Sequence, residues 1–518
     1  MKAQAVAFDQ PCHSAYEKFI EITNHLRGEA LSAGTHSEVE AYLEEDGREL
    51  LRLLLQEQLA SRGSGRVGEA VCGADGVVRP HKRDHLERSY QSVFGRVQVE
   101  RTGYGQQGVA SLFPLDAQLN LPAQGYSHRL QQRVARQAAK ESFEEVVKDI
   151  EAETGVHIGK RQVEEIVSTA AHDFEAFYAQ PLPEDLQRQA QSQPIQVLTF
   201  DGKGVVMRPE GLREGTRKKA EASPPRSPRG FSRQAKANRK RMATVAGIYH
   251  LDRQIRCPHT VAQQFAPLRL VHPNQTAAPK PVAKRLWASL EKPMKAVIEA
   301  GFEEGVRRDP AHQAEWVVLV DGDTTQIDYI QQAAKKYEAT VVIILDIIHV
   351  LEYLWKATNA LFDPDDAKGA QWWVADRIEQ LLQGQRTSMV RCLRRAATVK
   401  GLSPKQREPI EQCITYLTNH ASYLNYPHYL AKGYPIATGV IEGACRYVVK
   451  DRMEITGARW GLEGGEAVLK LRALYLNGDF DAYWKFHEQQ EYQRNHQAKF
   501  SEMPKARPHL QLIPTGKG

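Results

Sequence analysis

Three short apolar runs, each containing an acidic residue near its end, stand out in the hydrophobic pattern of the chain. They read IQVLTFDGK at 195–203, WVVLVDGD at 316–323 and VVIILDIIH at 341–349. Their length and their content of Val, Ile and Leu are typical of buried strands. Asp-Gly after a strand is also an ordinary turn signal, so a single run carries little weight. The recurrence of the arrangement predicts an α/β sheet with carboxylates gathered at one edge.

The surrounding pattern predicts three strands followed by two alternations of helix and strand. A clear strand covers 241–252, a short one covers 254–258, and apolar spacing predicts a helix over 281–306. Further helices are predicted over 327–337 and 349–361. This order, an antiparallel trio followed by two parallel strands, resembles that of the RNase H-like fold.

That fold has its first and fourth strands as neighbours. The resemblance therefore implies that Asp201 and Asp321 lie side by side, with Asp346 one strand further out. We expect Asp321, rather than Asp346, to be the second carboxylate of a site centred on Asp201. The predicted fold class is an α/β RNase H-like catalytic core with a mixed five-stranded sheet, whose first part spans 195–363.

Helical and hairpin patterns precede this core. Residues 15–62 show three- and four-residue apolar spacing that predicts helices ending near Gly63, and alternation over 88–104 predicts a small β-hairpin. We assign 1–125 to this mainly helical N-terminal region and interpret it as a packing or dimerisation layer. The hairpin carries no cysteines, so nothing in it supports a zinc ribbon.

Residues 126–180 carry a helix-turn-helix-like pattern. Two helical runs end at Gly155, and a further helix begins near Lys160 with basic residues at its start. Such a pair can read DNA, and an ordinary helical bundle gives the same pattern, so both interpretations stay open. Residues 181–194 combine proline with polar residues and predict a linker before the core.

A strongly basic segment follows Asp201. Residues 208–241 contain twelve Lys or Arg against three Glu, together with PPRSPRG. This composition predicts a mobile loop. Because the segment follows the strand that carries Asp201, we expect it to hold the phosphate backbone of DNA; a solvated charge run is the alternative. The DNA-binding candidates of this part are Lys203, Arg217, Lys218, Lys219, Arg239, Lys240 and Arg241.

An all-helical insertion over 364–432 separates the first part of the core from a third acidic candidate. The core resumes over 433–490, where a helix starting near Thr438 carries Glu442, and a tail spans 491–518. A carboxylate on a helix packed against the sheet can complete a metal site with two strand-borne acids. Further DNA-binding candidates follow Glu442 in the chain: Arg446, Lys450, Arg452, Arg459 and Trp460.

The three acids suit the cutting and joining of phosphodiester bonds. Two Mg²⁺ ions about 3.5–4 Å apart can activate the attacking oxygen and stabilise the leaving oxygen, and they require hard carboxylate ligands. Asp201, Asp321 and Glu442 are therefore the candidate metal ligands and catalytic residues, with Asp201 as the bridging carboxylate. The chain has no GxxxxGKS loop, HExxH motif or nucleophilic Ser or Cys motif, so rival enzyme classes lack support.

Composition narrows the picture further. A chain of 518 residues predicts about three domains, and a net charge of +6 is only mildly basic. No apolar run is long enough to span a bilayer, and the first residues lack the apolar core of a signal peptide. We therefore expect a cytoplasmic protein, associated with the nucleoid when DNA is bound. The six scattered cysteines form no CxxC pair, which argues against structural zinc and a disulfide framework.

Several motifs carry a resemblance to a known family. They are LTFDGKG at 198–204, VLVDGD at 318–323, GVIEGACR at 439–446, SLFPLDAQLNLP at 111–122, and TGARW at 456–460 followed by LKLRAL at 469–474. Weak singly and specific in combination, they resemble those of a bacterial insertion-sequence transposase of the DDE class, of the ISKra-type family. The DxxH of Asp346–His349 and the helical insertion are similar to features of mutator and hAT transposases.

The resemblance implies a reaction and a set of roles. It implies Mg²⁺-dependent cleavage at the ends of a mobile element, with Mn²⁺ as a substitute, and strand transfer by the freed 3′-hydroxyl. It assigns Asp201, Asp321 and Glu442 as the catalytic triad and Asp346 and His349 as accessory residues near the site. Both strand handling and simple packing at a helix start remain open for His349.

The implied partners are double-stranded DNA and further copies of the chain. The DNA comprises the terminal inverted repeats and the target, and holding two ends together requires a homodimer or a higher oligomer; no membrane partner is expected. Trp460 either stacks on an unpaired base or packs in the core. The alternative functions are a DNA-binding regulator and a nuclease that cuts without joining, although the presence of all three acids favours an active transposase.

Overall fold

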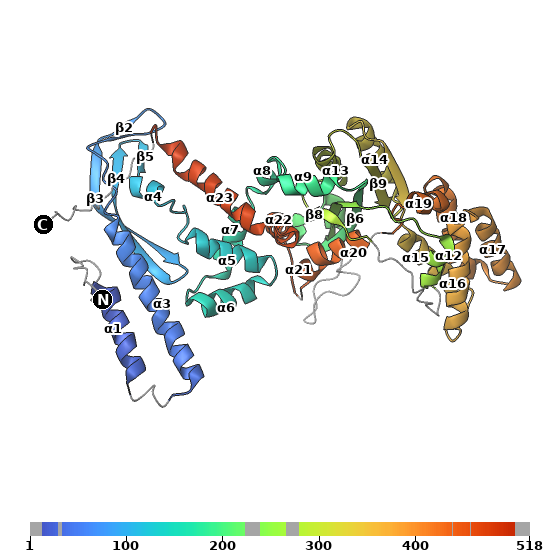
Figure 1. Ribbon diagram of the computed structural model, residues 1–518, viewed down its shortest axis with the longest axis horizontal. Helices are drawn as coiled ribbons and strands as arrows, with labels where there is room; N and C mark the ends of the chain where they lie inside the picture. The colour runs from blue at the N-terminus through green and yellow to red at the C-terminus, as the bar shows by residue number, and fades with distance from the viewer. Residues whose placement is uncertain are drawn as a thin grey trace, which may run out of the picture. The chain divides into compact units, whose positions relative to one another are not determined.

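The computed structural model describes residues 13–28, 34–222, 239–265, 279–437, 439–455 and 457–502. It consists of two compact units (Figure 1). Unit 1 comprises Met1–Phe177 together with Asp479–Gly518, and unit 2 comprises Tyr178–Gly478. The C-terminal helix α23 (Phe480–Asn495) thus belongs with the N-terminal region, whereas the sequence pattern assigned 433–490 to the end of the core.

Unit 1 begins with two helices and a small antiparallel sheet. Helices α1 (His13–Arg27) and α3 (His36–Ser61) confirm the expected helical region, and Gly63 follows with a positive φ of 69°. Strands β3 (His81–Ser92) and β4 (Gly95–Gln106) form the predicted hairpin. Short elements complete this part: β1 (Val71–Cys72), β2 (Val78–Arg79), β5 (Val109–Leu112) and α4 (Pro114–Gln118).

A group of three helices follows in unit 1, with the boundaries that the sequence predicts. They are α5 (His128–Ala138), α6 (Phe143–Thr154) and α7 (Lys160–Ala170), and the short α8 (Phe174–Tyr178) comes next. Gly155 ends α6 in the left-handed region, with φ of 67°, where glycine carries no Cβ penalty. Helix α23 is anchored to this group because Asp173 accepts hydrogen bonds from His487 at 2.7 Å and from Arg494.

Unit 2 is built on a five-stranded mixed sheet. Its strands in spatial order are β10 (Val341–Leu345), β9 (Glu315–Val320), β6 (Ile195–Val206), β7 (Lys240–Leu251) and β8 (Val282–Ser289). Strands β6, β7 and β8 pair antiparallel, and β9 and β10 extend the sheet from β6 in parallel. The antiparallel trio followed by two parallel strands is the predicted arrangement.

The third strand of the sheet differs from the prediction. Residues 254–258 contain no strand, and β8 lies at Val282–Ser289, inside the range predicted as one helix. The four-residue spacing of Val282, Leu286 and Leu290 fits a strand as well, since a period of two divides four. Pro293 disfavours helical backbone at the residue before it, and helix α13 (Met294–Arg308) therefore begins only after this proline.

Helices cover the sheet of unit 2 and continue beyond it. The segment predicted as a linker contains α9 (Glu184–Gln191), and part of the predicted basic loop is the helix α10 (Glu214–Glu221). The predicted helices after β9 and β10 are α14 (Thr324–Lys336) and α15 (Ile347–Asn359). The remaining elements near the sheet are η1 (Pro209–Gly211), α12 (Pro258–Ala262), η2 (Gln263–Phe265), α20 (Gly439–Ala444), the π-helical turn η4 (Cys445–Lys450), α21 (Asp451–Met453) and α22 (Leu462–Asn477).

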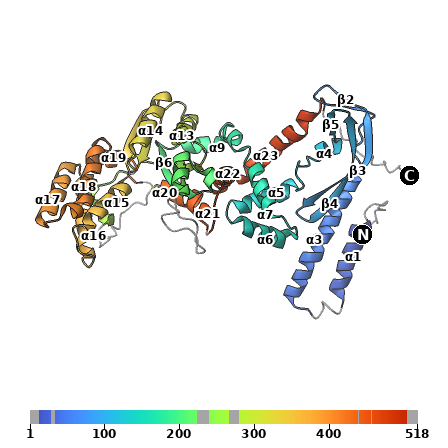
Figure 2. The same cartoon turned by 180° about the vertical axis from the view of Figure 1, so that it is seen from behind.

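The predicted helical insertion is confirmed as a group of helices between α15 and α20. It consists of α16 (Ala367–Leu382), α17 (Arg386–Val399), α18 (Pro404–Asn419), the single turn η3 (Ala421–Tyr423) and α19 (Tyr426–Lys432). Figure 1 shows these helices on the β9 side of the sheet, away from β8, and Figure 2 shows the same group from behind. The insertion therefore stands next to the strands that carry Asp321 and Asp346.

Candidate functional site

Asp201 and Asp321 come from adjacent parallel strands. The pairing of β6 with β9 ends with Thr199 and Leu319, each two residues before its aspartate, and Asp321 directly follows the last residue of β9. Strand β6 runs on to Val206 beyond the end of β9, so Asp201 lies within its strand rather than at its tip. Both residues are partly buried. The expected neighbourhood of the first and fourth strands is confirmed.

Asp346 stands on the far side of Asp321 from Asp201. Leu345 pairs with Val320, and the backbone N–H of Asp346 donates to the carbonyl of Val320 at 2.8 Å. Its side chain is 2% exposed and accepts a hydrogen bond from the N–H of Ile348 at 2.8 Å. Asp346 therefore caps α15, one strand further out than Asp321, as expected. His349 lies in the first turn of α15 and is partly buried.

Glu442 lies on α20, which packs against β6 and β7. Its side chain is exposed. Cys445 follows three residues later as the buried first residue of η4, and its thiol donates to Oδ2 of Asp201 at 3.1 Å. This contact links the helix of Glu442 to Asp201. Thr438, near which the helix was predicted to start, lies outside the described residues, and α20 begins at Gly439.

Sequence reasoning did not single out Cys445. Burial of the side chain, followed by the negative charge of Asp201 and its hydrogen bond, raises the pKa of the thiol far above its usual value. The thiol is thus neutral and acts as a hydrogen-bond donor. Its only signal in the sequence was its place inside the GVIEGACR motif, because nothing in the spacing connects residue 445 with residue 201.

The donor chemistry of the paired strand carboxylates fits a hard divalent cation. Asp201 and Asp321 offer carboxylate oxygens from neighbouring strands, and the described residues supply neither of them with a Lys or Arg ion-pair partner. Such unneutralised oxygens are the ligands that Mg²⁺ prefers. In the part of the chain that the structure describes, however, no three His, Cys, Asp or Glu side chains are close enough to hold a metal ion. Asp201, Asp321 and Glu442 are thus not gathered into one three-residue metal site in this conformation.

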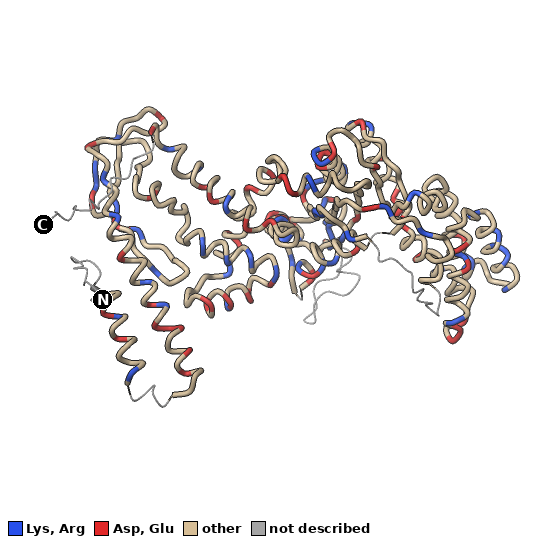
Figure 3. Tube along the Cα trace, in the orientation of Figure 1, with Lys and Arg blue, Asp and Glu red and all other residues tan. Residues whose placement is uncertain are grey.

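The basic candidates divide into exposed and structural residues. Lys203 follows Asp201 by two residues on the same face of β6 and is partly buried. Arg446, Lys450 and Arg459 are exposed and close in sequence to Glu442. Figure 3 shows Lys and Arg interspersed with Asp and Glu in both units.

Two arginines predicted to contact DNA are used inside the protein instead. Arg452 is 1% exposed, and its guanidinium lies over the ring of Trp460 at 4.9 Å. Arg241 donates to the backbone carbonyls of Leu290 at 2.7 Å and Gly211 at 3.1 Å. The buried guanidinium of Arg452 is not available to a phosphate, so its DNA-binding assignment is corrected to a structural one. Arg241 is partly buried, and its two hydrogen bonds give it a structural role in the fold.

The rest of the basic segment is mixed. Arg217, Lys218 and Lys219 are exposed on α10, where Lys218 pairs with Glu214 at 2.9 Å. Lys240 is exposed at the start of β7, whereas Arg239 is partly buried and donates to the carbonyl of Ala220 at 3.2 Å. Residues 223–238 of the predicted loop lie outside the described residues.

Trp460 belongs to the core of unit 2. Its ring is 5% exposed, and its indole N–H donates to the carbonyl of Met453 at 3.0 Å. A buried ring with a satisfied N–H cannot stack on a base without leaving its place. Of the two interpretations of Trp460, core packing is the one that its burial supports, and its assignment to DNA binding is corrected.

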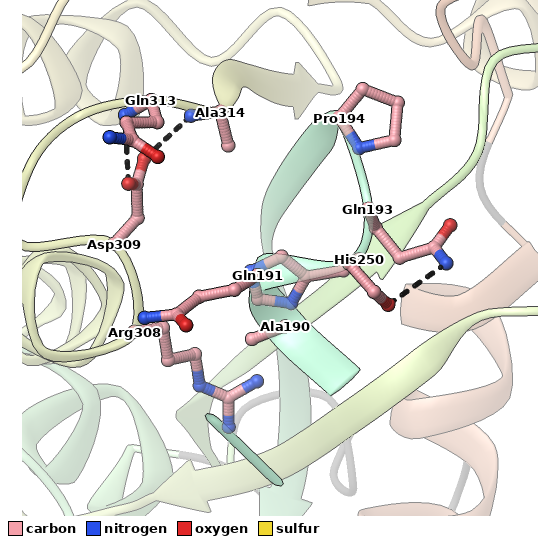
Figure 4. A pocket seen from close by; sticks show the side chains of 10 residues that line it. Ala190, Gln191, Gln193, Pro194, His250, Arg308, Asp309, Gln313 and Ala314 are labelled. Carbon is pink, nitrogen blue, oxygen red and sulfur yellow. Dashed lines mark hydrogen bonds between the residues drawn. The ribbon is translucent and has the colours of Figure 1, made fainter. Parts of the chain in front are cut away.

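A cavity of about 310 Å³ lies at the opposite edge of the sheet (Figure 4). Its lining includes Pro194 before β6, Ala314 before β9 and His250 near the end of β7. Because parallel strands begin at one edge and end at the other, this cavity is remote from Asp201 and Asp321. It is therefore not the site that the sequence predicts.

No model of a known protein family matches the chain, and no curated protein matches it either. Among the helices of the described residues, none combines the length and apolar character needed to cross a bilayer.

Proposed function

We propose that this chain is a DDE transposase of a bacterial insertion sequence, with an RNase H-like catalytic core in unit 2. In this proposal the protein binds the terminal inverted repeats of its element, cleaves DNA at the ends and joins the ends to target DNA. Its partners are double-stranded DNA and further copies of the same chain. It works in the bacterial cytoplasm, on the nucleoid.

One observation supports this proposal above the others. Asp201 lies in β6, and Asp321 directly follows β9, the parallel neighbour of β6, in a sheet whose spatial order is β8, β7, β6, β9 and β10. That order is the one expected for an RNase H-like core. The hydrogen bond from Cys445 to Asp201 adds a link to the helix that carries the third acid, Glu442.

The residues have distinct tasks in this proposal. Asp201, Asp321 and Glu442 would hold Mg²⁺, which supplies an activated oxygen nucleophile and charge neutralisation during phosphodiester cleavage and transfer. Glu442 is exposed on α20, and the three acids are not gathered into one metal site, so we expect the α20–η4 segment to move when DNA and metal bind. The exposed cations near Glu442 would hold the phosphate backbone: Arg446, Lys450 and Arg459.

A cleavage and strand-transfer assay tests the proposal. Purified full-length protein is incubated with labelled DNA carrying the inverted repeats that flank its gene, in Mg²⁺, Mn²⁺, Ca²⁺ or EDTA, beside the Glu442→Ala protein. We expect Mg²⁺-dependent cuts at the repeat ends and joined products, with neither in the variant. Glu463→Ala is a suitable control, since Glu463 is an exposed acid in the first turn of α22.

Two other results would redirect the assignment. Binding to the repeats without cleavage in any metal would refute the enzyme and favour a DNA-binding regulator. Cleavage without preference for the ends, and without joined products, would favour a nuclease of the same fold.

A further inference from the structure

The helical insertion touches the sheet at the turns that follow β9 and β10. Three of its polar side chains, Tyr416, His420 and Tyr426, each lie within hydrogen-bond distance of a backbone carbonyl at these turns. We call these three residues the clamp. They are 7%, 6% and 0% exposed respectively, so water does not compete for their contacts.

Two clamp residues act on the turn of Asp321. The Tyr416 hydroxyl donates to the carbonyl oxygen of Asp321 itself at 2.6 Å, and Nε2 of His420 lies 2.8 Å from the carbonyl oxygen of Gly322. Gly322 has φ of +98°, and a Cβ there would come within 2.8 Å of Cε2 of Tyr416. The backbone on both sides of the Asp321 carbonyl is therefore held against α18.

The third clamp residue acts on the neighbouring strand. Tyr426 donates to the carbonyl oxygen of Leu345, the residue before Asp346, at 2.8 Å. Tyr416 also stacks on Tyr353 of α15, with ring centroids 4.0 Å apart and planes at 15°. Because Asp346 caps α15, the insertion holds the ends of both outer parallel strands together.

We propose that the insertion positions Asp321 for metal binding, with Tyr416 and His420 as positioning residues. This inference rests on the proposed function and deepens it. A carboxylate binds a metal well only if its backbone is fixed, and a loose turn would let Asp321 drift from the ion that it shares with Asp201. Removing an outer partner of a metal ligand commonly costs about 10–100-fold in metal affinity or activity.

The test is Tyr416→Phe in the full-length protein, which keeps the stacked ring and removes only the hydroxyl. We expect the Mg²⁺ concentration for half-maximal cleavage to rise about tenfold. Mn²⁺ binding to the DNA-free protein, followed by electron paramagnetic resonance, should weaken by a similar factor, which gives a readout independent of activity. Tyr423→Phe is the matched control because the Tyr423 hydroxyl accepts from Gln331 of α14 at 3.2 Å and touches neither turn.

The outcomes separate the inference from the proposed function. If Asp321→Ala abolishes cleavage while Tyr416→Phe gives the wild-type Mg²⁺ and Mn²⁺ curves, the positioning role is refuted and the transposase stands. Retained cleavage by Asp321→Ala would refute the proposed site itself, a result that no clamp variant can produce. If Tyr416→Phe does not fold, a comparison of His420→Gln with His420→Ala tests the inference instead. Gln retains a hydrogen-bond donor near the position of Nε2, so His420→Gln should keep the metal affinity that His420→Ala loses. Equal Mn²⁺ curves for these two variants would overturn the inference.

Discussion

The thiol of Cys445 donates a hydrogen bond to the carboxylate of Asp201 at 3.1 Å. These two residues are separated by most of unit 2 in sequence, and their contact joins the central strand β6 to the π-helical turn that follows Glu442. π-helical turns occur frequently at functional sites. The contact therefore identifies the segment after Glu442 as part of the candidate site.

The state of this thiol can be checked by alkylation. Thiolates react and neutral thiols do not, and burial with the nearby Asp201 charge raises the pKa of Cys445. We expect iodoacetamide at mildly alkaline pH to label the exposed Cys257 at least about 10-fold faster than Cys445. Peptide mass spectrometry gives both rates in one sample, and labelling in denaturant provides the control. Equal rates in the folded protein would contradict the buried, hydrogen-bonded thiol.

The acids of the three strands should differ in importance. Asp201→Ala and Asp321→Ala should each lower the cleavage rate at least about 100-fold and leave end binding nearly intact. Loss of a residue that only supports a metal ligand costs up to about 100-fold, and loss of a ligand itself should cost at least as much. Asp346→Ala should be milder and should cost about 1 kcal/mol of stability, because its carboxylate caps α15. Cleavage rates, end binding and thermal unfolding measure the three effects. A dead Asp346→Ala beside an active Asp321→Ala would reverse the assignment of the second carboxylate.

The basic residues after Glu442 should differ in their contribution to DNA binding according to how deeply they are buried. Arg446→Ala and Lys450→Ala remove exposed cations and should each reduce the slope of log affinity against log salt by about 0.9. Arg452→Ala should leave that slope unchanged and destabilise the fold, because its guanidinium is buried over Trp460. Titrations of repeat DNA at several salt concentrations, together with melting curves, distinguish these effects. A smaller slope for Arg452→Ala alone would show that the buried arginine becomes accessible on DNA.

His250 should make stability depend on pH. It is 1% exposed, neither ring nitrogen has a hydrogen-bond partner among the described residues, and burial lowers its pKa from 6.5 to about 3. Below pH 6.5 the histidine is protonated in the unfolded chain but stays neutral in the folded protein. The free energy of unfolding therefore falls as the pH drops from 6.5 towards about 3. Between about pH 8 and about pH 5 the loss amounts to about 2 kcal/mol.

The measurement for His250 is a comparison with His250→Asn. Urea unfolding at both pH values should show a loss about 2 kcal/mol smaller in the variant than in the wild type. The difference between the two proteins is the relevant quantity, because burial also lowers the pKa of His128 and His496 in unit 1. Identical pH profiles would mean that the ring is protonated in the folded state.

Much of the fold followed from local pattern. The helix boundaries near Gly63, Gly155 and Lys160, the hairpin of unit 1 and four of the five strands of unit 2 agree with apolar periodicity and with glycine at helix ends. The prediction of a helix where β8 lies was wrong because a four-residue spacing of apolar residues fits both a strand and a helix. The assignment of α23 to the core was wrong because its place in unit 1 depends on Asp173, which lies more than three hundred residues earlier.

The sequence alone determined which residues carry the candidate chemistry: acids following or ending apolar runs, and a glutamate on a helix that basic residues follow. It could do so because strand and helix signals are local and because the carboxyl ends of parallel strands meet at one edge. Only the tertiary structure decided what surrounds those acids. Contacts between distant segments buried Arg452 and Trp460, joined Arg241 to the carbonyl of Leu290, set Cys445 against Asp201 and brought Tyr416 to the carbonyl of Asp321. Burial and long-range hydrogen bonds arise when the chain closes on itself, and no periodicity along the sequence encodes them.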